Sequence, residues 1–233
     1  MSSSRRAGHG APFLGISYAP SVRSRIFLLS PAGCSGKRAE LLLREGARFD
    51  LALRLREPQG AALGEVFAFL SGLYFRGKLA YARAFARPPE GTPGALVITS
   101  NAGLVPTERP VTVEALRGYS QVAIDAAEPR YRRPLLRDAS RLARLAGPGA
   151  EVVLLGSIAT GKYVEPLLEV FGPRLLFPPE FVGRGDMSRG GLLLRHAREG
   201  RELSYLPVGG SVRHGPRPPR LPRAPRSTRE LGP

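Results

Sequence analysis

The chain has 233 residues, of which 42% are hydrophobic and 23% are charged. This balance is enough for one well-buried core, so we expect a single domain. The longest apolar runs, such as 152–155, are far shorter than the roughly 20 residues that a membrane-spanning helix needs, so we expect no membrane partner. A single cysteine excludes an internal disulfide and a multi-cysteine metal site.

The net charge is +16, and much of it lies at the two ends of the chain. Residues 1–25 contain four arginines and no acid, and residues 211–233 contain six arginines and one glutamate. We expect a basic flexible tail over 1–25, one α/β ligand-binding domain over 26–210, and a Pro/Arg-rich disordered tail over 211–233. Such tails attract nucleic acid or acidic surfaces. A general preference for arginine over lysine along the chain is the alternative explanation of their charge.

The N-terminal basic residues are not followed by an apolar segment, so we expect no secretory signal and a cytoplasmic protein. Two of the three histidines lie in the predicted tails, at positions 9 and 214. We therefore expect neither a zinc cluster nor a histidine-centred triad, and no metal or cofactor.

Strand-like and helix-like segments alternate between the tails, which predicts an α/β three-layer sandwich with a mainly parallel sheet of about five to six strands. One long helix is expected over 63–86, or two helices divided near Gly72 or Gly77. A further helix is expected to have Pro134 in its first turn and to end at 147–149. The expected strands are 26–30, 95–100, 121–125, 151–155, 174–177 and 202–208.

The first expected strand runs into a glycine-containing turn at 30–38. Ser35 and Lys37 in this turn are candidates for binding an anion at the following helix. Cys34 is a candidate nucleophile, because a thiol near a helix N-terminus has a lowered pKa. An ordinary tight connection between strand and helix is the alternative.

The second expected strand ends in the small polar residues Ser100 and Asn101. Their side chains are candidates for hydrogen bonds to a base or a sugar. A glycine turn closed by an Asx-type bond is the alternative.

The segment 151–163 is a short apolar strand followed by a loop with the spacing of a phosphate-binding loop. Gly156, Ser157, Gly161 and Lys162 match the half of that motif that binds the anion. Tyr163 stands where the motif has the hydroxyl that binds magnesium. The loop therefore predicts a phosphate or carboxylate site that works without a divalent ion.

A third loop, 177–191, combines four glycines with arginines and carboxylates. Arginine binds phosphate through two parallel hydrogen bonds, and a carboxylate can bind a ribose hydroxyl or act as a general base. Capping of the next helix by the serine and internal ion pairing are the alternatives. The candidate residues are Glu180, Arg184, Asp186, Ser188 and Arg189.

Four segments in order, 34–35, 75–82, 96–104 and 161–167, resemble a poorly characterised bacterial family. That family has a strand followed by a Cys-Ser turn, a Phe-Arg-Lys-Ala helix and a Ser-Ala-x-x-Gly-Leu strand end. It is similar to a uracil-DNA-glycosylase-like domain that accompanies enzymes of deazaguanine tRNA modification. The resemblance spans about 26–195 and departs from the pattern in the loops at 156–162 and 183–191. It implies a nucleotide or nucleobase ligand and transfers no catalytic residue.

Together these patterns favour an enzyme or sensor that acts on a nucleotide, nucleoside or nucleic-acid base. Lys162 and Arg184 are expected to hold phosphate, and Asp186 or Glu180 to perform acid–base chemistry. A metal-dependent triphosphatase is disfavoured, because a tyrosine cannot replace the Ser/Thr metal ligand. The alternatives are a non-catalytic nucleic-acid-binding protein and an adaptor whose C-terminal tail binds a protein partner.

Overall fold

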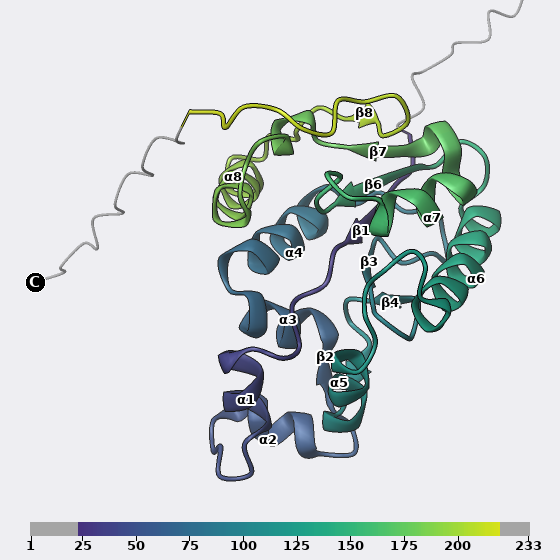
Figure 1. Cartoon of the computed structure of the whole chain (residues 1–233). Helices are drawn as coiled ribbons and strands as arrows, with labels where there is room; N and C mark the ends of the chain where they lie inside the picture. The colour runs from purple at the N-terminus through teal and green to yellow at the C-terminus, as the bar shows by residue number, and fades with distance from the viewer. Residues whose placement is uncertain (1–22, 220–233) are drawn as a thin grey trace, which may run out of the picture.

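The computed structural model describes residues 23–219, which form a six-stranded sheet between two layers of helices (Figure 1). The strand order is β4-β3-β1-β6-β7-β8. The four central strands are parallel, and β4 and β8 run antiparallel at the edges. The bounds are β1 Arg25–Leu29, β3 Ala95–Ile98, β4 Leu104–Pro106, β6 Glu151–Leu155, β7 Leu175–Phe177 and β8 Leu206–Pro207; a separate pair is formed by β2 Ala61–Ala62 and β5 Pro110–Val111.

Alternating residues of the central strands supply the cores on the two faces of the sheet. Phe27 and Leu29 belong to the core beneath α1 to α5 and α8, whereas Ile26 and Leu28 belong to the core beneath α6 and α7. The helices are α1 Lys37–Leu43, α2 Asp50–Arg56, α3 Leu63–Ser71, α4 Leu73–Phe85, α5 Val113–Ser120, α6 Pro129–Ala146, α7 Gly161–Phe171 and α8 Asp186–Arg198, with 3-10 turns at Gly172–Arg174 and Pro179–Phe181.

The predicted α/β sandwich is thus confirmed, and the strands expected at 26–30, 95–100, 151–155 and 174–177 are present with shifts of one or two residues at their ends. The strand expected at 202–208 shortens to β8. The strand expected at 121–125 is wrong: this segment is a loop. The place beside β3 is taken by β4, which returns directly from it. Val122 and Ile124 therefore pack against the core as loop residues.

The two expected helices differ from the structure in where they are divided and where they begin. The helix expected over 63–86 is divided at Gly72, whose φ of +62° suits glycine and ends α3. Pro134 lies inside α6 and not in its first turn, because the helix already begins at Pro129, with Glu128 accepting a hydrogen bond from the Arg130 amide. A proline at the first helical position and an acceptor at the cap are a standard start signal.

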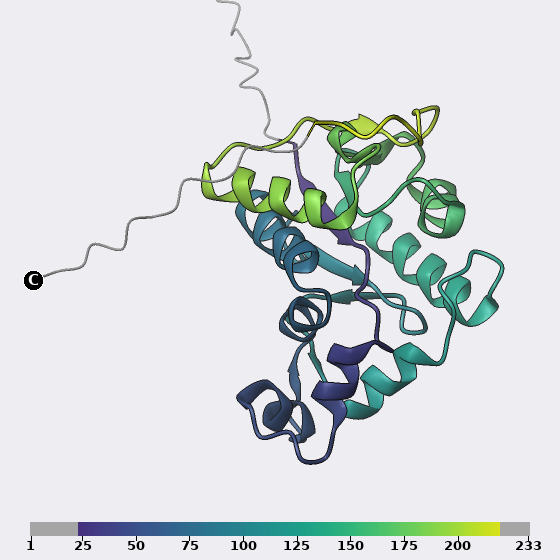
Figure 2. The ribbon, with the colours of Figure 1, turned by 60° about the vertical axis from the view of Figure 1, so that its left-hand side comes forward.

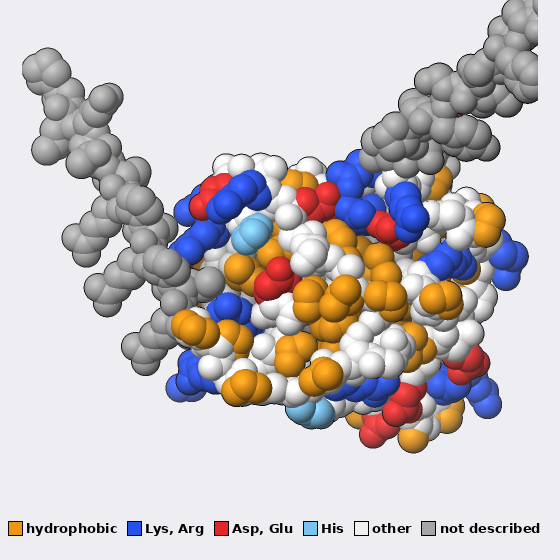
Figure 3. All heavy atoms as spheres, turned by 90° about the horizontal axis from the view of Figure 1, so that it is seen from above, with side chains coloured by type: hydrophobic (Ala, Val, Ile, Leu, Met, Phe, Trp, Pro, Cys, Tyr) orange, Lys and Arg blue, Asp and Glu red, His pale blue; other side chains and the backbone are white. Residues whose placement is uncertain are grey.

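Most of the two predicted tails lies outside the described residues, which exclude 1–22 and 220–233. Arg25, placed in the N-terminal tail by the sequence, begins β1. Residues 211–219 form neither helix nor strand. Seen from the side of β8, hydrophobic side chains gather in the middle of the face and basic ones around its rim (Figure 3). Within 23–219, no helix combines the length and apolar character needed to cross a membrane.

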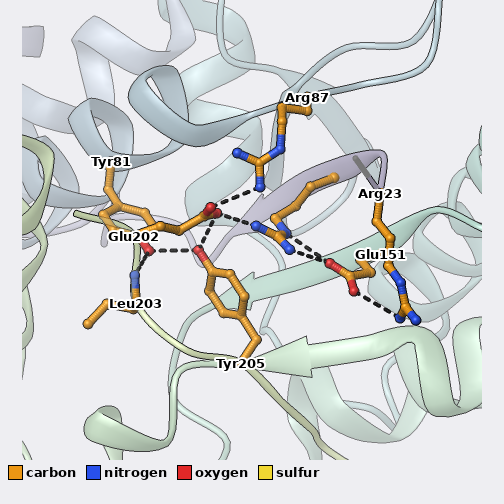
Figure 4. Close-up of polar contacts among 8 residues, drawn as sticks. Arg23, Tyr81, Arg87, Glu151, Glu202, Leu203 and Tyr205 are labelled. Carbon is orange, nitrogen blue, oxygen red and sulfur yellow. Dashed lines mark hydrogen bonds and ion pairs between the residues drawn. The ribbon is translucent and has the colours of Figure 1, made fainter. Parts of the chain in front are cut away.

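A polar network fastens the segment after α8 to the amino end of β1 (Figure 4). Arg25 forms ion pairs with both Glu151 and Glu202. Tyr205 donates to Glu202 at 3.0 Å, and its hydroxyl lies 2.6 Å from that of Tyr81. Half-buried charges of this kind are satisfied only as a group, so the network fixes the C-terminal segment against α4 and the sheet.

Helices α4 and α8 lie side by side and touch through two glycines (Figure 2). A Cβ added to Gly77 would lie 2.6 Å from the carbonyl oxygen of Gly190. A Cβ added to Gly190 would lie 2.7 Å from the carbonyl oxygen of Leu73. No side chain fits between the two backbones, so the glycines set the separation of the helices.

We expect Gly77→Ala to lower the free energy of unfolding by about 1–3 kcal/mol, the usual cost of forcing extra volume into a packed interior. Alanine is the better helix former by roughly 1 kcal/mol, so the sign of the change separates the contact from intrinsic propensity. Denaturant titration measures it. Gly46→Ala, in the turn between α1 and α2 with nothing within 4 Å of the added Cβ, is the control for a glycine that makes no close contact. A Gly77→Ala protein at least as stable as the parent would contradict the role of this contact.

Candidate functional site

A cavity of about 330 Å³ opens at the carboxyl ends of β1 and β6. The chain passes from β1 to β3 on one side, and β6 lies on the other side of β1. Open parallel sheets bind ligands at such reversals of strand order. Its walls come from the turn after β1, from α3 and α4, from the loop after α5, from the loop and helix after β6, and from α8: Ser30, Pro31, Ala32, Gly33, Ser71, Tyr74, Ile124, Ser157, Lys162, Tyr163 and Asp186.

A fully buried lysine on α4 joins that helix to the end of β1. Lys78 Nζ donates to the Ser30 carbonyl and lies 2.9 Å from Ser30 Oγ. Its nitrogen also lies 4.2 Å from the ring centroid of Tyr74 and 4.8 Å from that of Phe75. Burial lowers the pKa of Lys78 to about 7; the charge of Asp186 opposes this shift and that of Arg189 adds to it.

Two buried tyrosines form an aromatic wall of the cavity. The hydroxyl of Tyr74 is buried close to the side chains of Ser30 and Arg189, and it makes no hydrogen bond of good geometry among residues 23–219. Burial raises the pKa of Tyr74 to about 12. The pKa of Tyr163 is also raised, by burial first and then by the neighbouring Tyr74 and Asp186. Both hydroxyls are therefore protonated donors at neutral pH.

The N-terminus of α7 lies between this cavity and a second one of about 370 Å³. Lys162 and Ile124 line both cavities. The cap residue of α7 is Thr160, and its side chain makes no hydrogen bond to the first turn of the helix. The backbone amides of that first turn are therefore free to bind an anion. The carboxylate of Glu165 lies against Gly161, in the space that a Cβ would occupy, and opposes anion binding there.

Three of the predicted residues meet in the main cavity: Ser157, Lys162 and Asp186. Gly161 lines the second cavity with Lys162. Three others line an adjoining cavity of about 180 Å³ between the turn after β1 and α5: Cys34, Ser35 and Ser100. The phosphate-loop layout of strand, loop and helix is present, with α7 beginning at Gly161.

Cys34 does not show the lowered pKa expected of a nucleophile. Burial raises the pKa of its thiol to about 12. The thiol lies 3.6 Å from the Ala32 carbonyl, and α1 begins only at Lys37. Ser100 and Asn101 are engaged with α5, because they donate to the carbonyls of Tyr119 and Gly118. The turn at this strand end is closed by Thr99 rather than by an Asx-type bond.

Most candidates of the 177–191 loop make internal contacts. Arg184 donates to the Glu180 carbonyl and to Ser188 Oγ. Arg189 is buried and donates to the Phe181 carbonyl, with Asp186 Oδ1 at 3.5 Å. Ser188 lies inside α8 and is not its cap.

Several candidates lie away from these three cavities. One carboxylate oxygen of Glu180 accepts from Ser204, and the other is buried without a partner in the described part of the chain. Gly156 packs against Ser30, and Lys37 is exposed at the start of α1. Asp186 is the member of the 177–191 loop that reaches the main cavity.

Lys78, Tyr74 and Ser30 were not among the predicted site residues. A signal for Lys78 exists in the sequence, since it lies three residues after Phe75 and four after Tyr74, on the apolar side of the helix. A lysine at such a position is either extended to the surface or held by a buried partner. No local pattern marks Tyr74 as a wall of the pocket.

Comparisons with protein-family models, with curated proteins and with solved structures found no match for this chain. Within the described range, no three His, Cys, Asp or Glu side chains gather so that they could hold a metal ion. The pocket itself is therefore the basis on which a function can be inferred.

The lowered pKa of Lys78 predicts how stability changes with pH. Between about pH 7 and 10.5 the unfolded chain keeps a proton on this lysine that the folded protein lacks. The free energy of unfolding of the parent protein therefore rises with pH across this range, by up to about 1.4 kcal/mol per pH unit relative to Lys78→Met.

Denaturant titrations of both proteins from pH 7 to 9.5 test this expectation. The series stops there because tyrosines of the unfolded chain lose protons near pH 10, whereas burial raises the pKa of several tyrosines in the folded protein. Parallel curves for the two proteins would show that Lys78 stays charged in the folded state.

Proposed function

We propose that the cavity at the ends of β1 and β6 binds a nucleotide or nucleoside. Its volume of about 330 Å³ lies at the small end of the range for ligand pockets. The tyrosine wall offers apolar faces to a base, and Ser30, Ser71, Ser157 and Asp186 offer polar groups to a sugar. Lys162 and the free amides of α7 offer a site for phosphate that uses no divalent ion.

The observation that carries this proposal is the Tyr74 hydroxyl. It is buried in the pocket wall near the side chains of Ser30 and Arg189, and it makes no well-aligned hydrogen bond within residues 23–219. A buried polar group left unsatisfied costs about 1–3 kcal/mol. A ligand that brings an acceptor to this hydroxyl recovers that cost. Base and sugar oxygens and ring nitrogens are such acceptors.

Acid–base chemistry on the bound ligand is part of the proposal, and Asp186 is the residue we assign to it. Its carboxylate lies at the cavity, whereas Glu180 does not line it. The side chain of Asp186 is 69% exposed, so a ligand in the cavity can reach it. The cytoplasmic location expected from the sequence belongs to the same proposal.

Tyr74→Phe gives opposite expectations for binding and stability. Removing a hydroxyl that makes no well-aligned hydrogen bond leaves the free energy of unfolding unchanged or raises it by up to about 1 kcal/mol. It weakens nucleoside binding by roughly 2- to 12-fold, the value of one neutral hydrogen bond. Calorimetric titration with a nucleoside panel, beside denaturant titration, measures both. A Tyr74→Phe protein that is less stable and binds nucleosides as tightly as the parent would show that this hydroxyl does not contact the ligand.

For the phosphate site we expect Lys162→Ala to weaken the binding of a nucleoside monophosphate by about 10-fold or more, because a hydrogen bond to a charged group is worth about 1.5–3 kcal/mol. The binding of the matching nucleoside should change little. Glu165→Gln should strengthen the binding of the monophosphate, because it removes a negative charge from the N-terminus of α7. Lys37→Ala, an exposed lysine outside the cavity, is the control. Equal effects of Lys162→Ala on nucleoside and monophosphate would contradict a phosphate site at α7.

A further inference from the structure

The outer side of α6 carries a stripe of exposed arginines opposite its buried side. At 3.6 residues per turn these side chains fall within an arc of about 80° and extend over about 21 Å. The buried residues on the other side of the helix are Tyr131, Leu135, Ala139 and Leu142. The arginine stripe consists of Arg130, Arg133, Arg137, Arg141 and Arg144.

The helix itself does not account for the arginine stripe. Asp138 is the single acid within α6, and like charges four residues apart destabilise a helix. Arginines in the first turn also face the positive end of the helix dipole. Arg130 pairs with Glu128, and Arg137 with Asp138. The remaining three, Arg133, Arg141 and Arg144, have no acidic partner in the described part of the chain.

The start of α6 is fixed to the proposed phosphate site. The hydroxyl of Tyr131 donates to the carbonyl of Lys162 at 2.9 Å. The loop that leads into α6 lines the second cavity through Ile124, Asp125 and Ala126. Figure 1 shows α6 beside α7 on the outer side of the sheet. The arginine stripe therefore leads away from the pocket along the surface.

We propose that the arginine stripe binds the sugar–phosphate backbone of a single-stranded nucleic acid, which presents one unpaired nucleotide to the pocket. This inference rests on the proposed nucleotide site. A base that enters a cavity of this size has to be free of its pairing partner, so the substrate is a single strand or an unpaired end. Arginine suits the backbone because its guanidinium group meets phosphate through two parallel hydrogen bonds.

The spacing of the arginine stripe favours a nucleic acid over an acidic protein. One arginine per helical turn repeats about every 5–6 Å along a straight line, which suits a polymer with one charge per unit. Asp125 and Glu165 at the second cavity reduce the positive charge close to the pocket. The unpaired arginines lie farther along, so backbone contacts are expected away from the bound nucleotide.

The test uses the full chain and labelled 12-residue single-stranded RNA and DNA, with fluorescence anisotropy over a range of salt. One variant carries Arg133→Gln, Arg137→Gln, Arg141→Gln and Arg144→Gln. The matched control carries Arg48→Gln, Arg76→Gln, Arg109→Gln and Arg198→Gln, which are exposed positions outside α6. Poly-glutamate serves as an acidic polypeptide, and a nucleoside monophosphate reports the pocket separately.

We expect the α6 variant to bind the oligonucleotide about 10-fold more weakly or worse at physiological salt, and its salt slope to fall by roughly 0.7 for each phosphate that the variant no longer neutralises. The control should stay within about twofold of the parent, and both variants should bind the monophosphate like the parent. A difference between RNA and DNA would identify the sugar that is read.

Equal losses in both variants, or no loss in either, would overturn the assignment to α6. Poly-glutamate bound as tightly as the oligonucleotide would overturn it in favour of an acidic protein. Binding of the monophosphate with no binding of either oligonucleotide would reject this inference and leave the nucleotide pocket standing. Loss of the monophosphate in the α6 variant would show that α6 is not a separate surface.

Discussion

The contact between Gly77 of α4 and Gly190 of α8 fixes the geometry on which the pocket depends. Because the two backbones touch, a residue one turn before each glycine is brought to the same cavity: Tyr74 on α4 and Asp186 on α8. A larger residue at either position would separate the helices and with them the aromatic wall and the carboxylate. The positions of Tyr74 and Asp186 in the pocket therefore depend on two glycines that do not themselves line it.

Lys78, the residue after Gly77, connects α4 to the sheet. Its amine is satisfied by Ser30 and by two aromatic rings, so the lysine holds α4 at the carboxyl end of β1. An apolar side chain would fill this place without the cost of burying an amine. A buried ionisable group next to a pocket is more common at functional sites than in ordinary cores. Its low pKa lets a small change in the pocket charge alter its protonation.

The sequence predicted the layers of the fold well, because alternation along strands and periodicity along helices are local properties. It failed at 121–125, where Val122 and Ile124 alternate like a strand but the sheet edge beside β3 is already occupied by β4. The order of strand, glycine-containing loop and helix over 151–171 was predicted correctly, whereas phosphate binding there stays a prediction. The other half of the site, Tyr74 and Asp186 together, arises from the packing of helices far apart in sequence, which no local pattern reveals.

The arginines show why net charge alone is a poor guide to a partner. Arg25 is satisfied within a network of acids, and Arg189 by a carbonyl, so neither charge is free to attract a ligand. On α6 the same residue type is exposed, and three of five members of the stripe have no acidic partner in the described structure. Part of the excess charge on this fold therefore lies in one row, along a helix whose first turn is bonded to the loop of the pocket. A polyanion attracted by this helix is guided toward the pocket, whereas one attracted by evenly spread charge is not.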